Sequence, residues 1–274
     1  MTKIWLNDGL VDHDRGFVRV DDHGLTVGDG VFETMKATGG RAFAMTRHLE
    51  RLTRSARGLG LPDPDHALIR HACDEVLRAN PLPGAGRLRI TYTGGRSPLG
   101  SERGDAAPTV VVALGAAKER GESTAVVTVP WTRNENAPTT GLKTTSYADN
   151  VVMLAHAAAR GATEALFANT AGNLCEGTGS NVFLVLEGRV VTPPLSAGCL
   201  AGVSRALVLE WVGAEEVDLP LSVLAEADEV FLTSSLRDVQ GVHLVDDRAL
   251  VAPGPVTRKA METFAARAAD DIDP

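Results

Sequence analysis

The stretch from Glu176 to Phe183 reads Glu-Gly-Thr-Gly-Ser-Asn-Val-Phe, and the fold prediction starts from it. Two short patterns come after it at close spacing: residues 190–192 read Val-Val-Thr, and residues 200–205 read Leu-Ala-Gly-Val-Ser-Arg. Some thirty residues upstream, Lys143 stands in the run Leu-Lys-Thr-Thr-Ser-Tyr. A lone lysine or glutamate is most often a solvated side chain. The ordered combination of all four segments is what indicates chemistry.

This combination resembles the class IV, or fold type IV, pyridoxal-phosphate enzymes, which include branched-chain aminotransferases, D-amino acid aminotransferases and 4-amino-4-deoxychorismate lyases. The first half of the chain is also similar to them, through Gly-Asp-Gly-Val-Phe-Glu at 28–33 and His-Leu-Glu-Arg-Leu at 48–52. The resemblance therefore covers nearly the whole chain. It implies an α+β fold of two domains with the active site between them, and pyridoxal 5′-phosphate as the cofactor.

Composition excludes several other classes of protein. The 274 residues include 27 Lys and Arg against 35 Asp and Glu, a formal net charge of −8, which argues against binding to nucleic acid or to an anionic membrane. The three cysteines show no CxxC spacing, so neither a disulfide framework nor a metal site is predicted. Without the apolar stretch of a signal peptide at the N-terminus, the expected location is the cytoplasm.

Common catalytic and nucleotide-binding motifs are absent from the chain. It contains no GxGxxG after a predicted strand, no phosphate-binding GxxxxGK[ST] loop, no HExxH and no GxSxG. This disfavours dinucleotide-binding, zinc-protease and serine-hydrolase functions.

Apolar spacing and turn residues predict two domains, at 1–115 and 123–274, with the polar segment 116–122 as linker and the lysine in the larger C-terminal domain. Strands and helices do not alternate regularly, which favours α+β over a doubly wound sheet. In the first domain we expect a hairpin at 4–11, strands at 31–37, 41–45, 87–93 and 109–114, and helices at 49–59 and 65–80, with Thr46 as N-cap of the first. In the second we expect strands at 125–129, 165–168, 181–186, 189–192 and 229–233, and helices at 149–160, 202–212 and 256–269.

The resemblance implies a role for each cofactor-binding residue. Lys143 would form the Schiff base with the cofactor aldehyde and then move the substrate Cα proton, which requires a neutral amine. Glu176 would face the pyridine nitrogen and keep it protonated, so that the ring accepts electrons. The phosphate would be bound by Arg51, by Val203 and Ser204 where a helix begins, and by Ser235.

Fewer residues indicate which subgroup of this family the chain resembles. Thr34 comes directly after Phe-Glu, at a position where branched-chain aminotransferases usually have Gly. A threonine at this position resembles the aminodeoxychorismate lyases. The alternative is that Thr34 has only a structural role, packing across a strand pair. Candidates for binding substrate carboxylates are Arg89, Arg96 and Arg237. Arg96 lies in a Gly-rich loop that is either a substrate loop or a plain surface loop.

The sequence therefore predicts a lyase that converts 4-amino-4-deoxychorismate to 4-aminobenzoate and pyruvate, a step toward folate. The alternative is an aminotransferase for branched-chain or other amino acids that uses the same Lys143 and Glu176. A non-catalytic binding protein on this fold is a third hypothesis, disfavoured by the presence of both residues. The resemblance also implies a homodimer.

Overall fold

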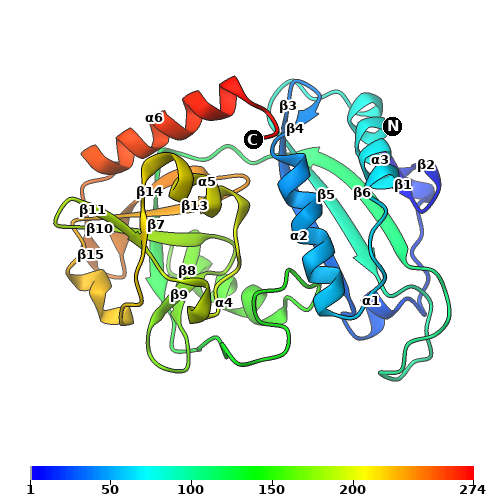
Figure 1. The fold of residues 1–274 in the computed structure, drawn as a ribbon, viewed down its shortest axis with the longest axis horizontal. Coiled ribbons are helices and arrows are strands. Elements are labelled where there is room, and N and C mark those ends of the chain that lie inside the picture. Colours follow the sequence, from blue (N-terminus) through cyan, green and yellow to red (C-terminus); the bar gives the residue numbers. More distant parts are fainter. Residues whose placement is uncertain (1) are drawn as a thin grey trace. The chain divides into compact units, whose positions relative to one another are not determined.

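A computed structural model describes residues 2–274, which form two compact units. Among the described residues, unit 1 comprises 2–118, 142–146 and 272–274, and unit 2 comprises 119–141 and 147–271. Each unit has its own β-sheet and its own helices (Figure 1). The mixture of strands and helices without regular alternation confirms the predicted α+β class.

Unit 1 is built on a six-stranded sheet in the order β2-β1-β6-β5-β3-β4, with every neighbouring pair antiparallel. Its strands are β1 (Lys3–Leu6), β2 (Gly9–Asp12), β3 (Gly30–Thr38), β4 (Arg41–Ala42), β5 (Gly86–Thr93) and β6 (Thr109–Ala116). Its helices are α1 (His23–Thr26), α2 (Met45–Gly58) and α3 (His66–Ala79), with a 3-10 turn at His13–Arg15. The β3 residues alternate between the two faces of the sheet, and Val31, Met35 and Ala37 pack into the core with the apolar stripes of α2 and α3.

The start of α2 differs from the sequence prediction. The return strand expected at 41–45 is only Arg41–Ala42, because Ala44 takes a left-handed conformation with φ of 53° and the helix begins at Met45. Thr46 is not the N-cap; that position is Ala44, which makes no side-chain cap. Instead, Asp273 from the end of the chain accepts hydrogen bonds from Thr46 N (2.7 Å) and Thr46 Oγ1 (2.6 Å).

Unit 2 contains a nine-stranded mixed sheet in the order β12-β11-β10-β13-β14-β7-β8-β9, with β15 paired to β14. The strands β14, β7 and β8 run parallel to one another in turn, as do β11 and β12. The strands are β7 (Ser123–Thr128), β8 (Glu164–Ala168), β9 (Leu174–Gly177), β10 (Asn181–Leu186), β11 (Arg189–Thr192), β12 (Glu215–Glu216), β13 (Glu229–Ser234), β14 (Asp238–Val245) and β15 (Arg248–Ala249). Strands β9 and β14 were not predicted from the sequence.

The helices of unit 2 are α4 (Ala148–Ala158), α5 (Val203–Val212) and α6 (Pro255–Asp270), with 3-10 turns at Leu195–Ala197 and Leu221–Ala225. Helix α4 packs against β8, and α6 packs against β14 and α5. The fully buried Phe183 and Phe231 stack with ring centroids 4.9 Å apart on the paired strands β10 and β13.

The segment that carries Lys143 groups with unit 1 rather than with the C-terminal part, contrary to the predicted domain boundaries. The physical reason is a set of backbone hydrogen bonds to β3: Phe32 N donates to Lys143 O (3.0 Å), and Thr145 N donates to Gly30 O (2.8 Å). These bonds extend the edge of the first sheet with residues from much later in the chain.

Within residues 2–274, no helix combines the length and the apolar character that a membrane span requires. The same residues contain no group of three or more His, Cys, Asp or Glu side chains that could hold a metal ion.

Candidate active site

The predicted site residues divide between the two units. Unit 1 contains five of them, and unit 2 contains the other five. Those of unit 1 are Lys143, Thr34, Arg51, Arg89 and Arg96, and those of unit 2 are Glu176, Val203, Ser204, Ser235 and Arg237.

Lys143 is fixed through its backbone on both sides. Its carbonyl accepts from Phe32 of β3, and its N–H donates to Ser55 Oγ of α2 at 3.1 Å. The half-buried side chain places Nζ 4.4 Å from the centre of the Phe32 ring. The structure therefore places this amine against an aromatic face, within the range of a cation–π contact.

The Phe32 ring also brings Arg89 close to the same place. The guanidinium carbon of Arg89 lies 3.6 Å from the ring centre. Thr34 stands directly opposite Arg89 in the antiparallel β3–β5 register, and alternation puts it on the same face as Phe32. One local arrangement thus contains Lys143, Thr34 and Arg89. The Phe32 ring is at its centre, and the sequence did not single out Phe32 as a site residue.

The same face of the sheet also carries a pair of positively charged side chains. Two residues beyond Thr34 along β3, and on the same face, Lys36 stands directly opposite Arg87. Like charges at directly opposed positions destabilise a sheet. This face therefore presents three positive side chains near Thr34, and it suits an anionic ligand.

The opposite face of β3 carries a buried ionic cluster. Glu33 has 0% exposure and accepts from Arg51 Nε (2.8 Å) and Nη2 (2.7 Å), and from His48 Nδ1 (2.7 Å). Burial is the largest single effect and would raise the pKa of Glu33, but the charge of Arg51 and the hydrogen bonds from Arg51 and His48 together hold this pKa well below its usual range. Burial lowers the pKa of His48 despite Glu33, so the imidazole is neutral and its Nδ1–H donates. Arg51, the predicted phosphate ligand, is thereby oriented by Glu33.

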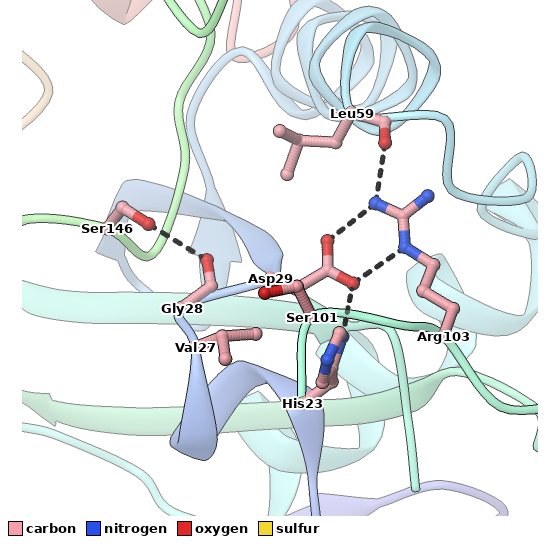
Figure 2. Close-up of a pocket in the computed structure, with 8 residues that line it drawn as sticks. All are labelled: His23, Val27, Gly28, Asp29, Leu59, Ser101, Arg103 and Ser146. Carbon is pink, nitrogen blue, oxygen red and sulfur yellow. Dashed lines mark hydrogen bonds and ion pairs between the residues drawn. The ribbon is translucent and has the colours of Figure 1, made fainter. Parts of the chain in front are cut away.

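A pocket of about 410 Å³ lies elsewhere in unit 1, lined by His23, Val27, Gly28, Asp29, Leu59, Ser101, Arg103 and Ser146 (Figure 2). Asp29 accepts two hydrogen bonds from Arg103, both 2.7 Å, and His23 Nδ1 lies 2.8 Å from its Oδ2. The hydrogen bonds from Arg103 hold the pKa of Asp29 below its usual value, and the hydrogen bond to Asp29 raises the pKa of His23.

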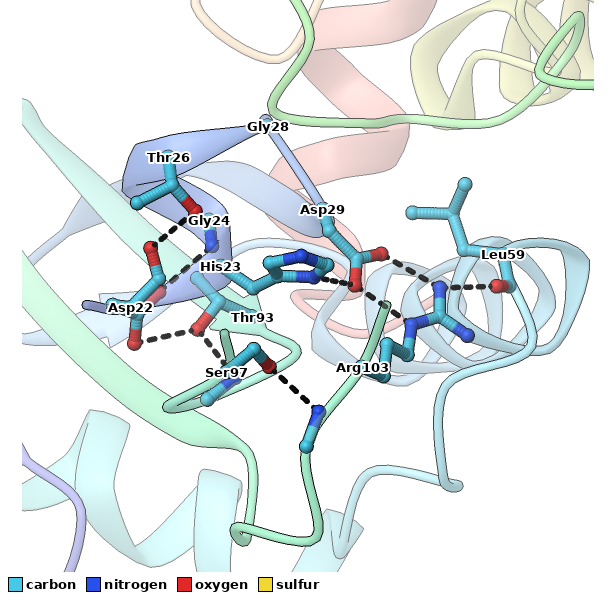
Figure 3. Close-up of polar contacts among 12 residues, drawn as sticks. Asp22, His23, Gly24, Thr26, Gly28, Asp29, Leu59, Thr93, Ser97 and Arg103 are labelled. Atoms are coloured by element: carbon cyan, nitrogen blue, oxygen red, sulfur yellow. Dashed lines mark hydrogen bonds and ion pairs between the residues drawn. The ribbon is translucent and has the colours of Figure 1, made fainter. Parts of the chain in front are cut away.

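Arg103 also fastens the Gly-rich loop for which the sequence allows either a substrate-binding or a plain surface role. It donates to the carbonyl oxygen of Leu59 at 2.6 Å, just after the end of α2 (Figure 3). It also donates to the carbonyl oxygen of Gly60 at 3.0 Å, and Gly104 N donates to Ser97 Oγ at 3.1 Å. Within this loop, Arg96 pairs with Asp21 at 3.2 Å and its side chain stays 58% exposed. Arg96 thus pairs with a surface carboxylate, and its substrate role stays a prediction.

In unit 2, Glu176 lies on β9 with 8% exposure. Its Oε2 accepts from Leu200 N (3.0 Å) and Asn181 Nδ2 (3.4 Å), and its Oε1 lies 3.7 Å from Arg133 Nη2. The carboxylate is therefore oriented by two segments of the sequence signature. The contact with Arg133 was not anticipated, since no local pattern marks that residue.

Helix α5 begins at Val203, with Gly202 as an N-cap that has no side chain to satisfy the first N–H groups. A side chain at Gly202 is excluded, because a Cβ there would come within 2.0 Å of Asn181 Oδ1. Val203 and Ser204 are buried at this end, and Ser235 is half-buried in the turn between β13 and β14. An uncapped helix start with a buried serine hydroxyl is a donor set that fits a phosphate group.

The third substrate candidate, Arg237, is engaged inside unit 2. Its Nη2 donates to Thr163 O (3.0 Å) and lies 3.6 Å from Glu164 Oε2, and its Nη1 donates to Gln240 Oε1. Burial lowers the pKa of Arg237 to about 10, and Glu164 opposes this shift. Three internal partners hold the guanidinium, and a role of Arg237 in substrate binding stays a prediction.

Comparison with known proteins supports the family resemblance. The family model described as "Amino-transferase class IV" matches residues 30–245. The chain is 33% identical, over 96% of its length and 95% of the relative's, to a Methanocaldococcus jannaschii protein that carries the provisional name branched-chain-amino-acid aminotransferase. It is 31% identical, over 90% and 92%, to a bifunctional aminodeoxychorismate lyase / D-amino acid transaminase of Mycobacterium tuberculosis.

Among solved structures, the chain resembles a hypothetical aminotransferase from Mycobacterium tuberculosis in its PLP-bound form. The TM-score is 0.89 with 28% identity, over 98% of this chain and 100% of that one. The predicted fold type and the predicted cofactor are confirmed by these findings. The chain belongs to the class IV aminotransferase family of enzymes that depend on pyridoxal 5′-phosphate.

Proposed function

We propose that this enzyme is a lyase that converts 4-amino-4-deoxychorismate to 4-aminobenzoate and pyruvate. The observation that carries the proposal is the β3–β5 face. Thr34 stands opposite Arg89, and the Phe32 ring contacts both Arg89 and Lys143. A hydroxyl and a cation close to the proton-moving amine suit a substrate with carboxylates whose carbanion expels a leaving group. The bifunctional relative, which includes this lyase activity in its name, supports the same function.

The predicted cofactor-binding residues have a chemistry that fits pyridoxal 5′-phosphate. When bound, this group takes up the electrons left by the departing proton. Lys143 Nζ would bind its aldehyde carbon, and the carboxylate of Glu176 would face its ring nitrogen. Arg51, oriented by Glu33, and the α5 start at Val203 and Ser204 would bind its phosphate, together with Ser235.

Within the reaction, Lys143 Nζ would take the proton from the amine-bearing ring carbon of the substrate. The ether bond to the enolpyruvyl group then breaks, the ring becomes aromatic, and the leaving group takes up a proton to become pyruvate. The atoms balance without a second substrate. Arg89 would hold a substrate carboxylate, and the Thr34 hydroxyl would assist proton transfer near Lys143.

The second candidate is an aminotransferase for branched-chain or other amino acids. The provisional name of the M. jannaschii relative favours it, because that protein is 33% identical over nearly the full length. Lys143 and Glu176 would have the same roles. The two functions diverge after the proton is removed: the lyase expels pyruvate, whereas the aminotransferase transfers the amino group to a keto acid.

The deciding experiment supplies the purified enzyme with pyridoxal 5′-phosphate and aminodeoxychorismate and measures pyruvate and 4-aminobenzoate. A parallel panel pairs branched-chain and D-amino acids with 2-oxoglutarate. We expect equal amounts of the two lyase products, with no keto acid required. Amino transfer at about 1 s⁻¹ or faster, typical of enzymes, without pyruvate from aminodeoxychorismate would favour the second candidate instead.

Two variants connect the reaction to the site. Thr34→Val should lower the lyase kcat by about 10²-fold, the lower range for a lost proton-transfer group, with a smaller effect on cofactor affinity. The matched control is Thr38→Val, at the exposed end of the same strand and face. Borohydride should fix the cofactor covalently on Lys143, and peptide mapping that finds it on another lysine would contradict the assignment.

We also propose a homodimer located in the cytoplasm. Helix α4 presents exposed apolar side chains, with Val151 62%, Val152 55% and Leu154 42% exposed, as is common at protein interfaces. Light scattering coupled to gel filtration should give twice the chain mass of 28.8 kDa. Substitution of Val151 and Val152 by Asp should shift that mass toward the monomer if α4 forms the interface.

A further inference from the structure

Glu164 is a buried carboxylate at the start of β8 that the proposed reaction does not use. Its residue exposure is 2%. Oε1 accepts from Thr178 N at 2.8 Å and from the Thr178 hydroxyl, and Oε2 accepts from Ser180 Oγ at 2.8 Å. Burying a charge is costly unless hydrogen bonds and opposite charges compensate it. Here most of the compensation comes from a single turn, residues 177–180.

That turn connects the two strands that carry the cofactor-facing groups. Glu176 is on β9 immediately before the turn, and Asn181, which donates to Glu176 Oε2 at 3.4 Å, is the first residue of β10. The turn packs closely on Glu164: a Cβ at Gly177 would lie 2.9 Å from Glu164 Cγ and 2.7 Å from Ser180 Oγ. Any shift of the Glu164 carboxylate would therefore displace the turn and both of its ends.

A second connection reaches the turn that carries Ser235. Arg237 Nη2 lies 3.6 Å from Glu164 Oε2, and Arg237 N donates to Ser234 O at 3.1 Å. The guanidinium is fixed independently by Thr163 O and Gln240. The Glu164–Arg237 pair thus joins two turns that are about sixty residues apart in the sequence, and each turn carries or flanks a predicted cofactor ligand.

We infer that Glu164 is a positioning residue: its buried carboxylate holds the 177–180 turn so that Glu176 and Asn181 present a fixed geometry to the pyridine nitrogen, with Arg237 as its partner. This inference rests on the proposed role of Glu176. Groups around a catalytic carboxylate must hold it within a fraction of an ångström, and removal of such orienting partners at other sites typically costs about 10- to 100-fold. Glu164→Gln preserves the shape, but it removes the charge and places an amide where only acceptors are needed.

The test compares Glu164→Gln with a matched control, Glu229→Gln. Glu229 is another buried glutamate of unit 2, and it accepts from Val256 N (3.0 Å) and Thr257 N (2.8 Å) at the start of α6. Three quantities are measured: the absorption spectrum of bound pyridoxal 5′-phosphate, kcat and KM, and amide hydrogen exchange in the cofactor-free protein.

For Glu164→Gln we expect a shifted cofactor spectrum, a decrease in kcat of about tenfold or more with KM changed less than about threefold, and faster exchange at Thr178. Glu164→Asp should restore part of kcat, because it keeps the charge. For Glu229→Gln we expect the exchange to change at 256–257, with the spectrum and kcat unaffected. An unchanged spectrum and kcat in Glu164→Gln, or equal changes in both glutamine variants, would overturn the inference.

Hydrogen exchange separates this inference from the proposed function, because it is measured without cofactor and reports directly on how Glu164 holds the turn at Thr178. If the wild-type protein fails to bind pyridoxal 5′-phosphate through Lys143, the proposed function fails, whatever the exchange at Thr178 shows for Glu164. If wild type binds the cofactor and turns over, and only the Glu164→Gln readouts stay at wild-type values, the positioning role alone fails.

Discussion

Glu33 in unit 1 and Glu164 in unit 2 are both almost fully buried beside a buried arginine, and the two pairs are compensated differently. In unit 1, Glu33 meets Arg51 with two hydrogen bonds of 2.8 and 2.7 Å, so the arginine charge dominates. In unit 2, Glu164 lies 3.6 Å from Arg237 and accepts instead from the N–H and hydroxyl groups of a turn. The same residue pair thus serves to orient an arginine in one unit and to hold a backbone turn in the other.

The two glutamates therefore hold different groups in place. Glu33 fixes the fork of Arg51, the predicted phosphate ligand, because two parallel hydrogen bonds leave the guanidinium little rotational freedom. Glu164 instead fixes main-chain and hydroxyl groups that flank Glu176. Four changes to the protein or its pH test this contrast and the cluster around Glu33, from the largest expected effect to the smallest.

Glu33→Ala should destabilise unit 1 more than Glu164→Ala destabilises unit 2. Removing one member of a buried ion pair typically costs about 3–5 kcal/mol, and Glu33 is directly hydrogen-bonded to Arg51. Without Glu164, Arg237 keeps its bonds to Thr163 O and Gln240, so the main loss is of partners for buried hydrogen-bond donors, at about 1–3 kcal/mol. Hydrogen exchange in increasing urea, read separately on peptides of the two units, measures both free energies of unfolding. Equal losses would mean that the closer arginine gives no extra stabilisation.

The free energy of unfolding of unit 1 should depend on pH through the ionisation of Glu33. Its pKa is depressed in the folded protein, so its contribution is complete above the unfolded value of about 4.3 and is lost as pH falls toward the folded value. A pKa difference of about one corresponds to about 1.4 kcal/mol. Glu33→Gln should therefore be less stable than wild type at pH 7, and the gap should narrow below about pH 4. A gap that stays constant down to about pH 2 would contradict the assignment.

Replacing His48 by Leu should cost unit 1 about 1–3 kcal/mol, less than the loss of Glu33. The neutral imidazole donates one hydrogen bond of 2.7 Å to Glu33, and the bonds from Arg51 persist without it. The same urea-dependent hydrogen exchange measures the change. A cost as large as that of Glu33→Ala would show that His48, rather than Arg51, is the main partner.

The smallest effect concerns the start of α2. Asp273→Ala should destabilise unit 1 by about 1 kcal/mol, the usual contribution of a helix cap, because Thr46 loses both of the hydrogen bonds that it donates to Asp273. Asp270→Ala, an exposed position at the end of α6, is the control and should change little. Equal effects of the two variants would indicate that net charge, and not capping, is responsible.

Local patterns were sufficient for most elements of the fold. The apolar spacing of 49–59 and 65–80 predicted α2 and α3, and the structure adds that Asp65 caps α3 by accepting from Ala67 N and Leu68 N. Strands β9 and β14 were missed, because β9 has four residues and β14 includes polar side chains that long-range contacts satisfy. Gln240 of β14, for example, bonds Arg237 and the Gly121 carbonyl.

The sequence by itself determined the family and the cofactor, because the signature around Glu176 and the segment of Lys143 are short, contiguous patterns. Only the tertiary structure decided which unit holds Lys143, which ring lies beneath it, and that Arg237 is engaged internally. The physical reason is the sequence separation of the residues involved. A catalytic motif keeps its residue types within a few positions, whereas a buried charge is compensated by whichever groups the fold brings near it, and the partners of Glu164 come from separate segments of the chain.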